Sequence, residues 1–346
     1  MPDLPGPEPA AGGDGEEQRR IARILGAVRE AARQAEDRER AAVAAELERL
    51  RGGKAGPLRS LLVLAVSLGL FVSLGRFAWG WEVLLLLLAV VLLHEAGHFA
   101  GMKLFGYADV SMFFIPFLGG AASGRAEGVP GWRRAAVALL GPVPGLALGL
   151  ALAAAAFVTG DRRLGLLATG FTLINAFNLL PFHPLDGGHL LGEVLYCRNR
   201  HAEFLVRAAS GALLAAAGVL LRQWVLVPLG AWGTLSAGWD LRLAGAAERL
   251  GRALPGSVLD SAGGGGMPPE ALAAALAETH RTWPQLEAPA DVALKVEALW
   301  SRAGRRPPGL LASAALLALY AGLLAVSVLA LGVFLWTRET GTGAAP

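Results

Sequence analysis

Two histidines, a glutamate and a lysine interrupt an otherwise apolar stretch of the chain, VVLLHEAGHFAGMKLFG at residues 90 to 106. His94, Glu95 and His98 form the pattern H-E-x-x-H. Residues four apart on an α-helix lie on one face, so both imidazoles can bind one zinc ion while the glutamate acts on its water as a general base. Ionisable groups are costly inside a membrane and usually functional there, which argues against a role in helix packing alone.

A catalytic zinc site needs a third protein ligand and keeps one position open. The stretch NAFNLLPFHPLDGGHLLGE, residues 175 to 193, offers two carboxylates. Asp186 is the favoured ligand because it follows an apolar segment, among prolines and glycines that end a helix and turn the chain. Glu193 is the alternative, since many soluble zinc peptidases use a downstream glutamate, but it lies about two helical turns further on. His183 and His189 flank Asp186 and are expected to be loop or neighbouring groups.

The composition indicates an integral membrane protein. Of the 346 residues, 54% are apolar and 17% are charged, and runs such as LLLLLAVVLL exceed what a soluble domain needs to bury. The basic residues are spread between apolar segments without interleaved aromatics, so no nucleic-acid partner is expected. The single cysteine, Cys197, allows no intrachain disulfide. Residues 1 to 57 lack the pattern of a cleavable signal peptide, so the first apolar segment is expected to be retained.

Hydropathy predicts an all-α polytopic membrane protein with about six or seven transmembrane helices. The candidate spans are 60–79, 83–105, 134–158, 164–181, 204–221, 224–241 and 309–336. The fifth and sixth are separated only by RQW and could form a hairpin that does not fully cross. With a cytosolic N-terminus, five of the 31 lysines and arginines fall on the far side, which favours that orientation: Arg76, Arg162, Arg163, Arg222 and Arg338.

Four regions are expected along the chain. Residues 1–57 form a cytosolic region with an amphipathic helix from about residue 18 to 50, and residues 58–241 form the membrane-embedded core. Residues 242–308 form a small cytosolic module with short helices near 269–282 and 287–302. Residues 309–346 form a last transmembrane helix and a short tail. Within the core, Pro116 and the following glycines predict a membrane-embedded β-hairpin near 107–122 rather than a spanning helix.

The two motifs together resemble the site-2 protease family of intramembrane zinc metalloproteases. That family pairs an H-E-x-x-H helix with a later N-x-x-P-x-x-x-L-D-G segment, and both occur here in this order. The second motif is matched by Asn178, Pro181, Leu185, Asp186, Gly187 and Gly188. The resemblance covers roughly residues 60 to 200.

The resemblance implies roles for individual residues. His94, His98 and Asp186 are the implied ligands of one Zn²⁺ ion, and Glu95 is the implied general base. Asn178 is implied to position the substrate or to stabilise the oxyanion. The hairpin, with Phe117, Gly119 and Gly120, is implied to bind an unwound substrate along a strand edge.

The leading hypothesis is therefore a zinc endopeptidase that cleaves a transmembrane protein near the cytosolic face of the bilayer. The expected location is the prokaryotic plasma (inner) membrane. One alternative is a membrane zinc peptidase of the prenyl-protein processing type, which would favour Glu193 as ligand. Another is a catalytically inactive metal-binding scaffold or a zinc transporter, although the sequence shows no paired internal repeats that mark a transport path.

Overall fold

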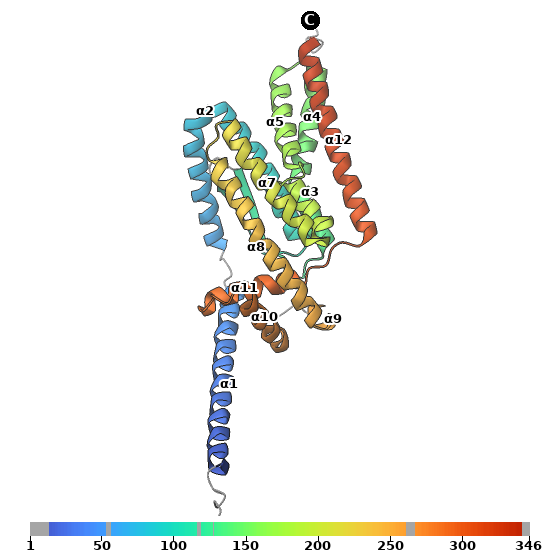
Figure 1. The fold of residues 1–346 in the computed structure, drawn as a ribbon. Coiled ribbons are helices and arrows are strands. Elements are labelled where there is room, and N and C mark those ends of the chain that lie inside the picture. The colour runs from blue at the N-terminus through green and yellow to red at the C-terminus, as the bar shows by residue number, and fades with distance from the viewer. Residues whose placement is uncertain (1–13, 53–56, 116–118, 127, 261–266, 341–346) are drawn as a thin grey trace, which may run out of the picture.

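The computed structural model describes residues 14–52, 57–115, 119–126, 128–260 and 267–340. It is 82% helical, and its described residues contain one two-stranded antiparallel sheet. The predicted class, a helical membrane protein with a short β-hairpin, is confirmed. Figure 1 shows α1 leaving the helical bundle at one end and the C-terminal end of α12 at the opposite end.

Five helical segments in the described part of the chain are long and apolar enough to cross a membrane. They are Leu58–Ala78, Gly80–Leu104, Gly131–Thr159, Arg200–Leu220 and Leu310–Val333. The fourth predicted span corresponds to α5 (Arg162–Asn178), which has only 17 residues. The sixth corresponds to α8 (Leu226–Ala253), whose second half is charged and continues well past residue 241. Five of the seven predicted spans therefore correspond to helices that are long and apolar enough to cross a membrane.

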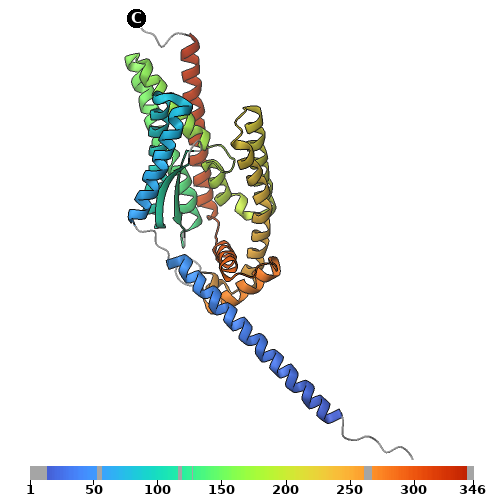
Figure 2. The same cartoon turned by 90° about the vertical axis from the view of Figure 1, so that its left-hand side faces the viewer.

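The first two spans form one helical hairpin, α2 (Pro57–Leu104), which turns at Gly80. Gly80 has φ 72° and ψ 172°, a conformation that glycine adopts without a steric penalty. The strands β1 (Ala108–Ile115) and β2 (Gly119–Arg125) follow α2 and pair antiparallel. Phe114 of β1 packs between Phe71 and Leu84 of α2, so the hairpin lies against these two spans (Figure 2).

The third predicted span consists of two helices, α3 (Gly131–Leu140) and α4 (Pro142–Thr159), which meet at Gly141. The side chain of Asp161 caps α5 by accepting a hydrogen bond from the backbone N–H of Arg163. Gly149 of α4 lies so close to α5 that a Cβ there would be 2.5 Å from Thr172 Oγ1. Short α6 (Asp186–Val194) then packs against α3.

The remaining helices complete the bundle and a layer at its end. After a 3-10 turn (Tyr196–Arg198), α7 (Arg200–Leu220) forms a hairpin with α8. The short helices α9 (Gly256–Asp260), α10 (Pro269–Thr282) and α11 (Pro289–Ala303) precede α12 (Leu310–Thr340). The predicted helices near 269–282 and 287–302 are α10 and α11.

The long helix α1 (Asp14–Gly52) is anchored at its C-terminal end only. Val43 and Leu47 are buried in an apolar cluster with residues of α8, α10 and α11. Toward the N-terminal end, Ile24 and Val28 are more than half exposed. Packing against the small module therefore accounts for the apolar positions near the C-terminal end of α1.

Candidate metal centre

Three side chains converge at one point inside the bundle. The candidate ligand atoms of His94, His98 and Asp186 all lie within 4.8 Å of one another. His94 Nε2 is 3.0 Å from Asp186 Oδ2, and His98 Nε2 is 3.1 Å from Asp186 Oδ1. The two Nε2 atoms are 3.2 Å apart. The structure thus joins the predicted ligand pair on α2 to the predicted third ligand on α6.

Hydrogen bonds behind the two rings set their tautomers. His98 Nδ1 lies 2.9 Å from the carbonyl oxygen of Val137, so Nδ1 carries the proton and donates it. His94 Nδ1 lies 2.9 Å from Asn175 Oδ1, while Asn175 Nδ2 donates to the carbonyl of Phe171. This leaves the lone pairs of both Nε2 atoms directed at each other and at a carboxylate, the donor set that binds a divalent cation. Two imidazoles and one carboxylate fit a catalytic zinc site with an open position.

The charge of Asp186 agrees with a ligand role. Asp186 lies at the start of α6, outside the five candidate spans. Burial raises the pKa of its carboxyl, but in the absence of a metal the adjacent His94 and His98 rings, when protonated, outweigh that effect and hold the pKa below its usual range. The carboxylate is therefore ionised and ready to bind a cation.

Close backbone packing brings Asp186 to the histidines. The chain turns between Asn178, the last residue of α5, and Asp186, the first residue of α6. A Cβ on Gly187 would lie 2.2 Å from the carbonyl oxygen of Leu179, so only glycine permits this turn. The hydroxyl of Tyr320, on α12, donates to the same carbonyl oxygen at 2.7 Å.

The junction of α3 and α4 closes the other side of the site. A Cβ on Gly141 would lie 2.2 Å from His98 Nε2. On α2, a Cβ on Gly97 would lie 2.0 Å from the carbonyl oxygen of Leu140. The absence of side chains at these two glycines lets the helices approach and holds the His98 ring in place.

Glu95 lies between the metal group and the β-hairpin. It is 6% exposed, and the backbone N–H of Ala122 in β2 donates to its carboxylate. Gly120 packs directly on it, since a Cβ there would be 2.4 Å from Glu95 Cγ. Glu95 also lines the same cavity as both histidines and Asp186. This is the position that a general base acting beside the metal requires.

The metal group lies at one end of a cavity of about 740 Å³. Asn178 and Gly120 line this cavity, and Asn178 Nδ2 donates to the carbonyl of Ile174 in its own helix at 3.1 Å. Gly119 begins β2 but is not among the lining residues. Phe117 lies outside the described residues.

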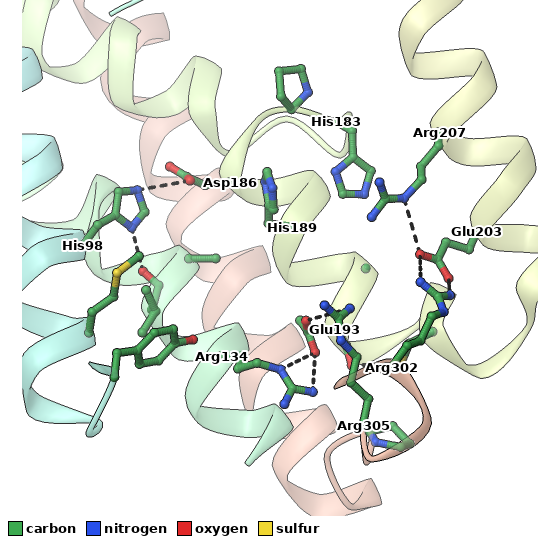
Figure 3. A pocket seen from close by; sticks show the side chains of 18 of the residues that line it. His98, Arg134, His183, Asp186, His189, Glu193, Glu203, Arg207, Arg302 and Arg305 are labelled. Atoms are coloured by element: carbon green, nitrogen blue, oxygen red, sulfur yellow. Dashed lines mark hydrogen bonds and ion pairs between the residues drawn. The ribbon is translucent and has the colours of Figure 1, made fainter. Parts of the chain in front are cut away.

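Glu193, the alternative ligand, is engaged elsewhere. Its carboxylate accepts hydrogen bonds from Arg134 of α3, with Oε2 3.0 Å from Nε, and it does not belong to the metal group. His183 and His189 stack edge to face with ring centroids 5.0 Å apart and line the cavity wall (Figure 3). Burial, Arg207 and His189 lower the pKa of His183 to about 3, which keeps this ring neutral.

The sequence favours a structural role for Asn175, a bond to a neighbouring helix, and the structure shows that this bond is made to the candidate ligand His94. Asn175 is fully buried and orients His94. The available signal was a polar residue on an apolar helix, one turn before Asn178, since a buried amide in a membrane helix needs a partner.

Comparison with known proteins places this site in context. No family model matches the chain. A candidate zinc metalloprotease of Synechocystis sp. is 32% identical over 167 residues, which are 45% of this chain and 44% of the relative. A zinc metalloprotease of Methanocaldococcus jannaschii is 28% identical over 140 residues, which are 39% of this chain and 40% of the relative. A solved structure, a site-2 protease from the same archaeon, has a TM-score of 0.36 and 20% identity, with 53% of this chain and 87% of that one covered.

The chain thus spans less than half the length of these two curated relatives. Both relatives are named as zinc metalloproteases, and the His94, His98 and Asp186 group of this chain is one that could hold a metal ion.

Proposed function

We propose that the chain is an intramembrane zinc endopeptidase that cleaves a transmembrane protein near the cytosolic face of the bilayer. The observation that carries the proposal is the meeting of His94 and His98 with Asp186, with Glu95 beside them in one cavity. The names of the curated relatives support the same activity. The pairing of Glu193 with Arg134 argues against the prenyl-protein processing alternative, in which Glu193 would bind the metal.

Each residue around the metal group has its own role in the proposed hydrolysis of a peptide bond. A bound zinc ion supplies Lewis-acid chemistry, because it acidifies water and polarises a carbonyl group. The Glu95 carboxylate takes the proton from the attacking water and passes it to the leaving amine. Asn175 and the carbonyl of Val137 hold the two imidazoles in the required tautomers throughout. Asn178 lines the cavity and is proposed to position the substrate.

The β-hairpin supports binding of an unwound substrate. A transmembrane helix already uses its carbonyls in hydrogen bonds, so a segment of it must become extended before attack. In the described residues β2 pairs only with β1, and Gly120 and Ala122 of β2 line the cavity. We expect the free edge of β2 to pair with the extended segment and to hold it beside Glu95.

The orientation of the chain belongs to the same proposal. We place α1, α10 and α11 in the cytosol and the end of α12 outside, in the prokaryotic plasma membrane. The distribution of lysine and arginine supports this orientation. His94 and His98 lie in the second half of the Gly80–Leu104 span, which is then the cytosolic half of the bilayer.

Reconstitution of the full chain in proteoliposomes tests the proposal. We expect cleavage of a single-span reporter protein, loss of cleavage with a zinc chelator and its return with added Zn²⁺. Bound zinc per chain should fall in Asp186→Ala and stay near one in Glu193→Ala. A metal-loaded chain that cleaves none of a panel of single-span reporters would favour the hypothesis of a catalytically inactive metal-binding scaffold. Zinc loss in Glu193→Ala alone would favour the prenyl-protein processing reading.

A further inference from the structure

The cavity extends beyond the metal group into an arginine-rich region. Five arginines line this part, which we call the arginine end: Arg134, Arg200, Arg207, Arg302 and Arg305. Glu193, Glu203 and Glu248 also line this part and Asp240 pairs with Arg207, so these groups leave an excess of one positive charge. Figure 3 shows several of these side chains grouped on the far side of the cavity from His98 and Asp186.

Glu248 pairs with Arg200 alone at 3.1 Å, but the other two glutamates of the arginine end are each shared by two arginines. Glu193 lies 2.9 Å from Arg134 and 3.8 Å from Arg305. Because a guanidinium carries five N–H donors, the Glu193 carboxylate cannot occupy the donors of both arginines, and Arg134 also donates to the carbonyl oxygen of Val129.

A second shared carboxylate lies on α7. Glu203 pairs with Arg302, and its Oε1 is 3.4 Å from Arg207 Nε. Arg207 also reaches Asp240 at 2.9 Å. This network joins α7 and α8 to the end of α11, so the small module of residues 242–308 forms part of the cavity wall. The arginine end is therefore built from parts of the chain outside the two sequence motifs.

Arg305 is the arginine best placed to bind a ligand. Its side chain is 48% exposed and its ion pair with Glu193 is the longest of those around the arginine end. Arg134 and Arg302 are more enclosed, with side-chain exposures of 13% and 16%, and their contacts with carboxylates are closer. Arg305 thus uses fewer of its N–H donors in close contacts within the chain than Arg134 and Arg302 do.

We propose that the arginine end binds acidic side chains in the cytosolic flank of the protein substrate. This inference rests on the proposed function and adds a specificity site to it. A segment held at the metal group meets the arginines as it leaves the cavity toward α11. Guanidinium groups bind carboxylates through paired, charge-assisted hydrogen bonds, which strengthen in a partly enclosed site. The result is selection among membrane proteins, whose cytosolic flanks are commonly basic.

A binding experiment tests this site without turnover. The full zinc-loaded chain carrying Glu95→Gln is titrated with two labelled peptides that differ only in Asp and Glu against Asn and Gln, and fluorescence anisotropy is recorded. We expect the acidic peptide to bind about three- to tenfold more tightly at ~0.1 M salt, with the difference shrinking as salt is raised. Arg305→Gln, added to this chain, should remove most of the preference.

Matched variants and a second measurement separate the outcomes. Arg163→Gln changes an exposed arginine at the start of α5 and should keep the preference. Arg200→Gln provides a second test if Arg305→Gln lowers zinc content. Equal binding of both peptides, a preference that survives both arginine variants, or inorganic phosphate that binds as tightly as the acidic peptide would overturn the inference. If reporters are cleaved equally whether their cytosolic flanks are acidic or not, the arginine end has no role in selection but the proposed function stands. If the acidic peptide binds preferentially but no reporter is cleaved, the proposed function is wrong and the binding site stands.

Discussion

At the scale of single residues, the site depends on hydrogen bonds behind the ligands as much as on the ligands themselves. Asn175 and the carbonyl of Val137 each fix one imidazole tautomer. Groups of this kind commonly contribute ten- to hundredfold to metal affinity, because a free imidazole loses orientation and basicity. The chemistry at Glu95 can be separated from metal binding, since this residue does not belong to the ligand group.

Replacing Glu95 with Gln should abolish cleavage while zinc content stays near one per chain. The amide keeps the shape of the side chain but cannot accept the proton of the attacking water. Reporter cleavage in proteoliposomes and metal analysis of the same preparation provide the two measurements. Cleavage at the native rate would show that another group is the base.

Replacing Asn175 with Ala should weaken zinc binding by about ten- to hundredfold, because His94 loses the acceptor that holds its Nδ1–H. Competition with a chromogenic zinc chelator measures this affinity directly. Asn178→Ala is the matched control, since the Asn178 amide bonds its own helix, and its zinc affinity should be unchanged. Equal losses in both variants would mean that general destabilisation of α5 is responsible.

At the scale of elements, glycines set the distances between the helices that carry the ligands. Gly141 lies against His98, and Gly187 lies against the turn before Asp186. Added methyl groups at such contacts force backbone shifts, whose cost is about 1–3 kcal/mol in well-packed sites. The short helix α6 therefore depends on its first turn for the position of the third ligand.

Replacing Gly187 with Ala should lower zinc affinity and the thermal unfolding temperature, because the new methyl group would meet the carbonyl oxygen of Leu179 at 2.2 Å. The matched control is Gly192→Ala in the same helix, where the nearest atom would be at 3.5 Å, an ordinary contact. Differential scanning fluorimetry and zinc titration of both variants measure the difference. Indistinguishable variants would contradict the role assigned to this turn.

At the scale of the whole molecule, parts outside the motif-bearing core reach the site. Tyr320 of α12 bonds the carbonyl of Leu179, and Arg302 of α11 pairs with Glu203 of α7. The module of residues 242–308 and α12 therefore both contribute contacts around the site. Figure 1 shows α1 and the C-terminal end of α12 at opposite ends of the bundle, and the proposed topology places these ends on opposite sides of the membrane.

Reporter fusions test that orientation in cells. A fluorescent protein that folds only in the cytosol should be bright when fused before α1 and dark when fused after α12. Alkaline phosphatase, which is active only outside, should give the reverse pattern. Matching signals at both ends would require an even number of crossings and would contradict the proposed topology.

The sequence alone determined the features that depend on local spacing and composition. His94 and His98 share a helix face because they are four residues apart, and apolar runs dictate a membrane protein. The hairpin followed from Pro116 and its neighbouring glycines. The prolines and glycines around Asp186 favour it over Glu193 as the third ligand, and the structure brings Asp186 to the histidines.

Only the tertiary structure decided which distant groups meet. The role of Asn175 depends on the packing of α4 on α5, where a Cβ on Gly145 would lie 2.1 Å from Asn175 Nδ2. The pairing of Glu193 with Arg134 and the basic end of the cavity likewise depend on contacts between helices far apart in the chain. Helix periodicity states which face a residue lies on, but the neighbour of that face is set by close packing of the whole bundle.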